Sequence, residues 1–159
     1  MTDAKQDFWD RIDGVQAGML GLTSDGELVP MSPNLREERD GKIWFITSTQ
    51  SELPTKLGDV AMPARFVVAD AKSGLYTNLE GTLELVDDSQ VLEEVWSVIA
   101  GAWFEDGKQD EDVQLMAFTP KMGGAWFSST NPARFVYEIA KAHATGSQPD
   151  TGYEATLQF

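Results

Sequence analysis

The sequence predicts a mainly β (α+β) fold, a six- to seven-stranded antiparallel barrel with flanking helices. Three observations support this prediction. Short runs of β-forming residues with alternating polarity recur along the chain, glycine-containing turns join several of them as hairpins, and helical patterns lie at the ends of the chain and between the hairpins. Because 159 residues are one domain's worth of chain, we expect a single domain over residues 1–159.

The N-terminal part of the sequence predicts a helix followed by a hairpin. Residues 3–12 carry apolar side chains at helical spacing, which is typical of a short amphipathic helix. Residues 15–23 then predict a strand. Asp25-Gly26 is the strongest hairpin signal in the sequence, so we expect residues 27–34 to be the returning strand.

The stretch from Gly41 to Leu53 is the one around which the rest of the chain is arranged. It begins at a turn glycine, continues as bulky β-forming residues and ends in small hydroxyl or amide side chains, so an apolar strand opens into a loop that can hold a ligand. We expect this strand to be the antiparallel neighbour of the extended residues 28–33. Ser51 is a candidate N-cap for a short helix that continues to about Asp59.

The second half of the sequence predicts one long hairpin, two helices and further strands. The hairpin pairs residues 64–71 with residues 75–86. Residues 89–103 follow the helical period, and we expect this helix to pack on the sheet. The remaining predicted elements are strands at residues 113–119 and 124–128 with a turn at 120–123 between them, a helix at residues 130–144 and a last strand at residues 153–159.

The composition excludes several classes of site and partner. With 26 acidic and 12 basic side chains the net charge is −14, which repels phosphate backbones and anionic lipid, so we expect neither nucleic acid nor membrane as a partner. The sequence has no cysteine and one histidine, His143, which leaves little for metal or thiol chemistry. The acidic run at residues 105–112 lacks the glycine and the terminal glutamate of a calcium-binding loop, so we interpret it as a solvated turn and expect no metal. No long apolar run and no basic, apolar leader are present, and we expect a cytoplasmic protein.

Several motifs in combination resemble those of one protein family. They are an x-Pro-Met stretch at residues 29–31, a Trp-Phe-x-Thr-Ser strand at residues 44–48, Gly-Thr-Leu-Glu-Leu-Val-Asp-Asp at residues 81–88 and Ala-Trp-Phe-x-x-Gly-Lys-x-Asp-x-Asp at residues 102–112. From about Phe8 to its C-terminus the sequence resembles the pyridoxamine 5'-phosphate oxidase-like proteins, and among them the general stress protein 26 group. The resemblance implies an FMN-binding split barrel, usually a homodimer with FMN held between the subunits.

The resemblance also implies where the flavin lies. Two strand segments run along the isoalloxazine ring and ribityl chain in the family, and they correspond here to Val29, Pro30 and Met31 and to Phe45, Ile46, Thr47 and Ser48. Trp126 matches a family aromatic that approaches the flavin from the partner subunit, and a core position is an equal alternative. Trp103, at the end of a helix, is a candidate for the ligand wall, the interface or the core.

Two cations of the family pattern are replaced in this sequence. The arginine that usually precedes Pro-Met is Val29, and the lysine that usually follows the loop into the short helix aligns near Leu53. Lys56 shares a helix face with Leu53, so Lys56 is the predicted substitute for holding the FMN phosphate, together with Ser51 and the amides at the helix start. An exposed, solubilising Lys56 is an equal alternative.

The function predicted from these residues is an FMN-dependent oxidoreductase of the general stress type. The flavin would carry hydride or electrons, while the protein supplies position, exclusion of water and hydrogen bonds to the ring. No side chain stands out as a catalytic acid or base. The alternative is a split barrel that is cofactor-free or binds deazaflavin and has a stress-related binding role; the replaced cations favour it, whereas the retained strand from Trp44 to Ser48 favours a flavin.

Overall fold

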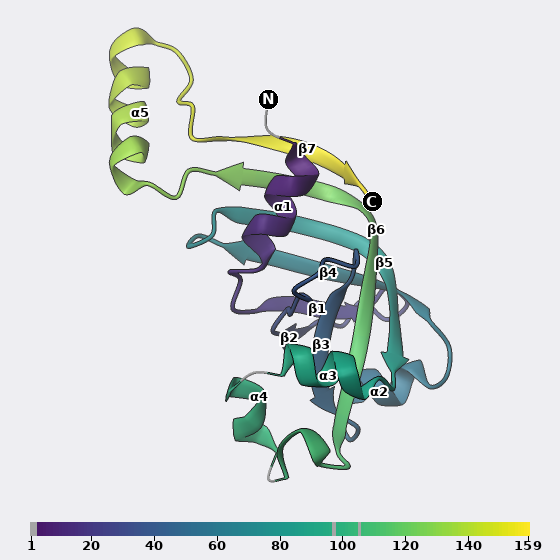
Figure 1. Ribbon diagram of the computed structural model, residues 1–159. Helices are drawn as coiled ribbons and strands as arrows, with labels where there is room; N and C mark the ends of the chain where they lie inside the picture. Colours follow the sequence, from purple (N-terminus) through teal and green to yellow (C-terminus); the bar gives the residue numbers. More distant parts are fainter. Residues whose placement is uncertain (1–2, 97, 105) are drawn as a thin grey trace.

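The computed structural model describes residues 3–96, 98–104 and 106–159 and shows a barrel of strands with helices around it (Figure 1). The predicted fold class is confirmed. In chain order the elements are α1 (Ala4–Ile12), β1 (Gly18–Leu22), β2 (Val29–Met31), β3 (Ile43–Ser48), α2 (Glu52–Leu57), β4 (Met62–Asp70), β5 (Leu75–Val86), α3 (Ser89–Val95), α4 (Val98–Trp103), the 3-10 helix η1 (Gly107–Gln109), β6 (Val113–Ser128), α5 (Pro132–Thr145) and β7 (Gly152–Gln158).

The seven strands form one antiparallel sheet that closes on itself at a single point. The strand order is β2-β1-β4-β5-β6-β3, and β7 pairs with β6 outside this path. The two ends of the path meet where the Asn34 N–H donates to the Trp44 carbonyl (N···O 2.9 Å) and the Trp44 N–H donates to the Asn34 carbonyl (2.8 Å). In the described part of the chain no further bridge joins β2 to β3. The barrel is therefore split along this seam.

The expected pairing of residues 28–33 with the strand after Gly41 is wrong apart from this one bridge. β2 pairs with β1, and β3 pairs along its whole length with β6. Proline explains why the bridge is not extended into a ladder. Pro30, which would lie opposite Ser48 in the register of the Asn34–Trp44 pair, has no backbone N–H to donate, so this edge of the sheet cannot form a continuous run of hydrogen bonds with β3.

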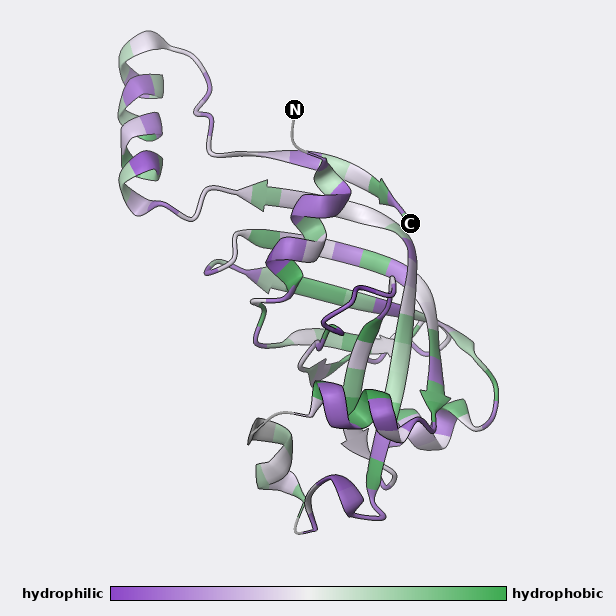
Figure 2. Ribbon diagram, viewed as in Figure 1, coloured by the Kyte–Doolittle hydropathy of each residue, from purple (hydrophilic) through white to green (hydrophobic). Residues whose placement is uncertain are grey.

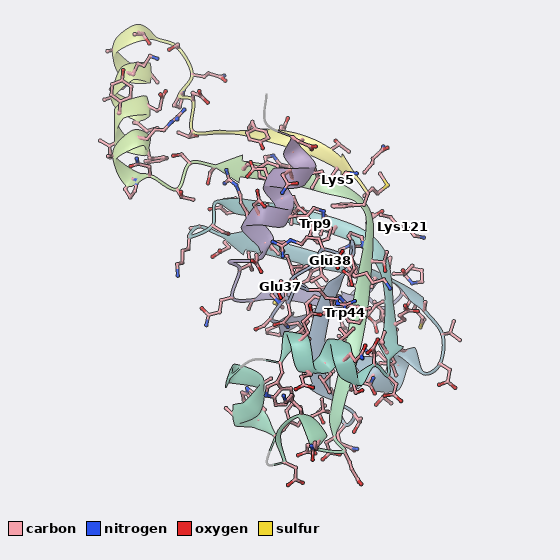
Figure 3. The ribbon with its side chains drawn as sticks, in the orientation of Figure 1. Lys5, Trp9, Glu37, Glu38, Trp44 and Lys121 are labelled. Atoms are coloured by element: carbon pink, nitrogen blue, oxygen red, sulfur yellow. The ribbon has the colours of Figure 1, made fainter. Side chains whose placement is uncertain are left out.

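β6 is one continuous strand of 16 residues, whereas the sequence predicted two strands with a turn at residues 120–123. The strand bends at a β-bulge instead of turning. Its register with β5 shifts at Gly81, so that Lys121, labelled in Figure 3, is left out of the β5 register next to Pro120. A bulge tolerates proline because no ladder N–H is needed there. Only glycine fits opposite, since a Cβ on Gly81 would lie 2.2 Å from the Thr119 carbonyl oxygen.

The main core fills the barrel and is covered by helix α1, which the sequence predicted. The Asp3 carboxylate caps this helix by accepting from the Lys5 N–H (2.9 Å), and Phe8 packs edge-to-face against Phe159 with ring centroids 5.3 Å apart. Figure 2 shows hydrophobic residues gathered along the strands. The largest fully buried side chains are Phe8, Phe45, Phe66, Phe118, Phe127, Ile12, Leu20, Ile43, Leu75, Leu79, Leu83 and Met116. Their burial is the main term that stabilises the fold.

Helix α1 is also tied to the barrel by a polar junction at Arg11. Its guanidinium pairs with Asp7 one turn earlier (Nε···Oδ1 2.8 Å) and donates to the carbonyls of Gly74 (3.0 Å) and Ser128 (2.7 Å). The Tyr153 hydroxyl on β7 donates to the other oxygen of Asp7, 2.5 Å away. Segments far apart in sequence therefore meet at one carboxylate–guanidinium pair.

A second, smaller apolar cluster lies on β3 and β6 under helix α3. Trp44, labelled in Figure 3, packs there with Val91 and Val95 of α3 and with Leu115 and Ala117 of β6. Because neighbouring residues of a strand point to opposite faces, Trp44 faces α3 while the residues on either side of it face the barrel interior. This confirms that the helix after the long hairpin packs on the sheet.

The helix predicted over residues 89–103 is two helices, α3 and α4. The Asp88 carboxylate caps the first of them, as its position before the helix predicts. The chain then becomes extended at Trp96 (φ −60°, ψ 133°), whose ring packs 6.0 Å from that of Phe104. Residue 97, within the predicted helix, lies outside the described residues. Helix α4 is a separate short helix that lies at one end of the barrel (Figure 1).

Helix α5 stands away from the barrel in the connection between β6 and β7 (Figure 1). Asn131 is the N-cap of this helix, since its side-chain oxygen accepts from two backbone N–H groups of the first turn. The apolar residues Phe135, Val136 and Ile139 are 51%, 66% and 45% exposed. The apolar face formed by these residues is thus largely uncovered in the single chain.

Among the described residues, no helix combines the length and the hydropathy needed to cross a lipid bilayer. A single domain and a cytoplasmic location stay predictions of the sequence.

Candidate functional site

A cavity of about 590 Å³ lies at the split of the barrel, between β2 and the second half of β3. Helix α4 and the acidic loop before β6 form its other side. Its lining residues are Ala17, Pro30, Met31, Ser32, Asn34, Ile46, Thr47, Ser48, Ser51, Ala100, Trp103, Phe104, Asp110 and Asp112.

The strand geometry explains why the cavity is where it is. The Trp44 backbone points across the seam to Asn34, and in an antiparallel strand every second residue points the same way. The backbone groups of Ile46 and the N–H of Ser48 therefore face the split, where no strand of the described chain continues the ladder. The Ser48 carbonyl is used locally, because it accepts from the Ser51 N–H (3.0 Å). The site thus presents unpaired strand edge to a ligand.

Small polar side chains form the rim beside this edge. The Thr47 hydroxyl donates to the Ser51 hydroxyl (3.2 Å), and the Ser48 hydroxyl accepts from the Gln50 N–H (3.1 Å). On the opposite strand, the Asn34 amide donates to the Trp44 carbonyl (3.1 Å), which fixes its orientation. Hydroxyl groups both donate and accept, so the rim can match the polar edge of a flat heterocycle.

Apolar side chains form the walls. Met31 and Ile46 come from the two strands of the seam, and Trp103 and Phe104 come from the end of α4. Phe104 is held by its contact with Trp96, whereas Trp103 is 81% exposed. A cleft with apolar walls and a few placed polar groups is the usual form of a small-molecule site.

The charge of the cavity is negative. Asp110 and Asp112 line it, and no lysine or arginine does so among the described residues. The Asp110 carboxylate accepts from the Asp112 N–H (2.9 Å), and the Thr49 N–H donates to the Asp112 carbonyl (2.8 Å), which ties the acidic loop to the end of β3. This loop was interpreted from the sequence as a solvated turn. It becomes part of the site because Ser48 pairs with Val113, a contact that no local pattern predicts.

Most of the residues expected to hold a flavin are brought together in this cavity. They are Pro30, Met31, Ile46, Thr47, Ser48, Ser51 and Trp103. Two others point elsewhere. Phe45 is fully buried in the barrel core against Phe66 (centroids 5.1 Å apart), since it alternates with its neighbours on β3, and Val29 packs against the same core.

Lys56 is placed outside the cavity lining, on helix α2. Its ammonium lies 2.7 Å from a carboxylate oxygen of Asp25 and 3.1 Å from one of Glu27, so it ties α2 to the turn after β1. These hydrogen bonds raise the pKa of Lys56, and the bond from Lys56 lowers the pKa of Asp25. The cation predicted as a phosphate ligand is therefore neutralised by two carboxylates of its own chain.

Trp126 lies near the opposite end of β6 from the cavity. Its side chain is half exposed, and its indole N–H donates to the Glu154 carboxylate on β7 (2.9 Å). Within one chain it makes no part of the cavity lining. A role beside the ligand would require the Trp126 of a second copy.

Comparisons with known proteins agree with this fold. A family model described as "Pyridoxamine 5'-phosphate oxidase like" matches residues 3–150. Among solved structures, the chain is similar to a candidate general stress protein 26 from Jannaschia sp. CCS1, with 46% identity, 100% of each chain covered and a TM-score of 0.94. It is also similar to a candidate general stress family protein from Xanthomonas campestris pv. campestris, with 27% identity, 82% of this chain and 93% of that chain covered, and a TM-score of 0.70. A third similar structure is the general stress FMN/FAD binding protein from Xanthomonas citri, with 25% identity, 79% of this chain and 89% of that chain covered, and a TM-score of 0.70. No curated protein matches significantly.

Proposed function

The chain belongs to the pyridoxamine 5'-phosphate oxidase-like family, and on that premise we propose that it binds a flavin with the isoalloxazine ring in the cleft between β2 and β3. The observation that carries the proposal is the open strand edge of Ile46 and Ser48, which faces a cleft with apolar walls. The similar protein from Xanthomonas citri, which is described as binding FMN or FAD, supports it.

The residues of the cleft fit the ring and ribityl chain of a flavin. Met31 and Ile46 provide apolar surface for the faces of a planar ring, and Thr47 and Ser51 provide hydroxyls for its polar edge or for ribityl hydroxyls. The phosphate of FMN, the form that the family resemblance implies, is not matched in the same way, because Asp110 and Asp112 are the charged residues of the lining.

We further propose that the protein is an oxidoreductase. A bound flavin supplies hydride or electron transfer, and the residues of the chain bind it, orient it and exclude water from its ring. The exposed Trp103 and the partly buried Phe104 are placed to cover a ligand from the side of α4. No side chain of the lining is assigned as an acid or base.

We also propose that two copies form a homodimer. Phe135 and Val136 on α5 and Trp126 on β6 are half exposed or more, and a helix of this length gains most of its stability from packing. Light scattering at micromolar concentration should give about twice the chain mass of 17.5 kDa. A mass of one chain would contradict the dimer.

The flavin proposal is tested on protein purified from a native-like host. We expect a visible absorption spectrum of flavin type, and we expect heat to release a chromophore that chromatography identifies as a flavin. Deazaflavin in the released fraction would support the alternative cofactor in the same cleft. Protein that carries no chromophore and fails to bind added riboflavin, FMN or FAD would overturn the proposal, and the cofactor-free binding role would then be favoured.

A further inference from the structure

We propose that the cleft selects flavin without its phosphate, so that this chain binds riboflavin in preference to FMN. The inference rests on the proposed function, since it concerns the same cleft. It follows from where the cations and carboxylates of the chain lie.

The cavity lining contains two carboxylates and no compensating cation. Asp110 and Asp112 lie on the loop that closes the cavity beside β3. The residues outside the described part of the chain are Met1, Thr2, Ser97 and Glu105, so none of them can add a lysine or arginine side chain to this lining. A phosphate placed in the cleft would thus meet negative charge without a charged donor from the described residues of the same chain.

The two positions at which the family pattern has cations cannot supply one here. Val29 is half-buried against the barrel core, and Leu53 is buried in the same core at 6% exposure. Neither belongs to the cavity lining. The loss of these cations is therefore not offset by a shifted side chain at either position.

Lys56 does not replace them, because its ammonium already contacts two carboxylates. Moving it to a ligand phosphate would break the contacts with Asp25 (2.7 Å) and Glu27 (3.1 Å) and leave those two charges without their partner. Glu52, in the first turn of the same short helix, adds a further negative charge. Neither Lys56 nor Glu52 therefore offers an uncompensated positive charge to a phosphate.

The uncharged part of a flavin meets no such obstacle. The isoalloxazine ring and ribityl chain are neutral, and they need only apolar contact and hydrogen bonds, which Ile46, Thr47 and Ser51 can provide. A phosphate carries nearly two negative charges and depends on charge-assisted hydrogen bonds for its binding energy. The lining accordingly distinguishes riboflavin from FMN by the charge of the phosphate, and not by the ring, which the two ligands share.

The test compares riboflavin with FMN on full-length protein from which any chromophore has been removed. Fluorescence titration should give a Kd at least tenfold lower for riboflavin than for FMN, a ratio that corresponds to about 1.4 kcal/mol. The ratio should fall as salt is raised, because screening weakens the repulsion between the phosphate and exposed carboxylates.

Charge variants locate the effect. Asp112→Asn removes one carboxylate of the lining and should lower the ratio of the two Kd values, whereas Glu111→Gln removes the same charge from the adjacent residue, outside the lining, and should leave the ratio unchanged. Equal or tighter binding of FMN by the unaltered protein would overturn the inference while the proposed function stands. Binding of neither flavin would overturn both.

Discussion

Asn34 and Trp44 exchange two backbone hydrogen bonds, of 2.9 and 2.8 Å, and in the described chain this pair alone joins the two ends of the sheet. On one side of the pair the barrel is closed around its core. On the other side the edges of β2 and β3 separate and the cavity begins. The position of this pair therefore sets where a ligand can enter between the strands.

Removal of one of these hydrogen bonds should destabilise the seam. Asn34→Pro eliminates the N–H that donates to the Trp44 carbonyl, and we expect unfolding in urea to show a loss of roughly 1–3 kcal/mol, because the carbonyl loses a buried partner. Asn34→Ala is the control, since it keeps the backbone N–H and removes only the side-chain bonds to Trp44 and Ser32. Equal stability of the two variants would show that the backbone pair is not what closes the barrel.

The hydroxyl of Thr47 should contribute to flavin binding without being needed for the fold. Thr47→Val keeps a β-branched residue in a strand, so stability should change little, while loss of one neutral hydrogen bond should weaken flavin binding about two- to tenfold. Ser48 is a poorer choice, because its hydroxyl also supports the Gln50 N–H in the following turn. Thr156→Val, on β7 and away from the cavity, is the matched control. Unchanged affinity for riboflavin in Thr47→Val would mean that this rim does not face the ligand.

The junction of Asp7, Arg11 and Tyr153 should make stability depend on pH at both extremes. Burial acts to raise the pKa of Asp7, but the hydrogen bonds from Arg11 and Tyr153 outweigh it and hold this pKa below its ordinary value of 3.8. The contribution of Asp7 is therefore complete above about pH 3.8 and is lost as the pH falls through its lower folded value. Burial and the hydrogen bond to Asp7 raise the pKa of Tyr153 from 10.0 to about 12. The folded state thus favours the neutral phenol, and stability should decline between pH 10 and pH 12.

Tyr153→Phe tests this pH dependence. The variant lacks the hydroxyl, so thermal unfolding between pH 9 and pH 12 should show a shallower decline than the unaltered protein, and acid should unfold it at a somewhat higher pH because Asp7 loses one donor. Parallel curves for the two proteins over the alkaline range would contradict the assignment.

The bulge between β5 and β6 should depend strictly on glycine at position 81. A Cβ there would lie 2.2 Å from the Thr119 carbonyl oxygen. Because this oxygen belongs to the backbone, no change of side-chain rotamer can relieve the clash. We therefore expect Gly81→Ala to lower the free energy of unfolding by at least about 2 kcal/mol, measured by thermal or urea unfolding. Gly124→Ala, on the paired strand, is the control, because its nearest neighbours are atoms of the Trp126 side chain at 3.4 Å or more. A similar loss of stability in both variants would mean that alanine is unfavourable for a reason other than the close contact at the bulge, such as strand propensity.

The parts of the fold that depend on neighbouring residues could be predicted from the sequence. The long hairpin of β4 and β5 follows from two alternating runs around one turn, and the caps at Asp88 and Asn131 follow from the residue types before each helix. The pairing of β2 with β1 follows from the turn signal at Asp25-Gly26, whereas the pairing of β3 with β6 could not be predicted, because it joins strands that are far apart in the sequence. The bulge in β6 was missed because Pro120 and the glycines after it have the composition of a turn.

The candidate site shows the same limit. The strand ending in Thr47 and Ser48 could be singled out from its change of polarity, and the family resemblance added Pro30 and Met31. The acidic residues of the lining could not be predicted from the sequence, since Asp112 reaches the cavity only through the pairing of β3 with β6. The ion pairs of Lys56 were missed for a similar reason, as helical spacing predicts which face a side chain occupies and not which carboxylates lie opposite it.

The single strand β6 has a consequence for how the molecule opens and exchanges with solvent. β6 is paired with β5 along its length, with β3 over its first half and with β7 over its second, so the end that borders the cavity and the end that leads to helix α5 belong to one hydrogen-bonded element. The pairing of β6 with β5 therefore couples the two ends to one another. Amide protons between Leu115 and Phe118, in the middle of this network, should exchange only through global unfolding. A ligand held at the cavity end would then slow exchange throughout the barrel, including at Trp126, by shifting a single cooperative equilibrium.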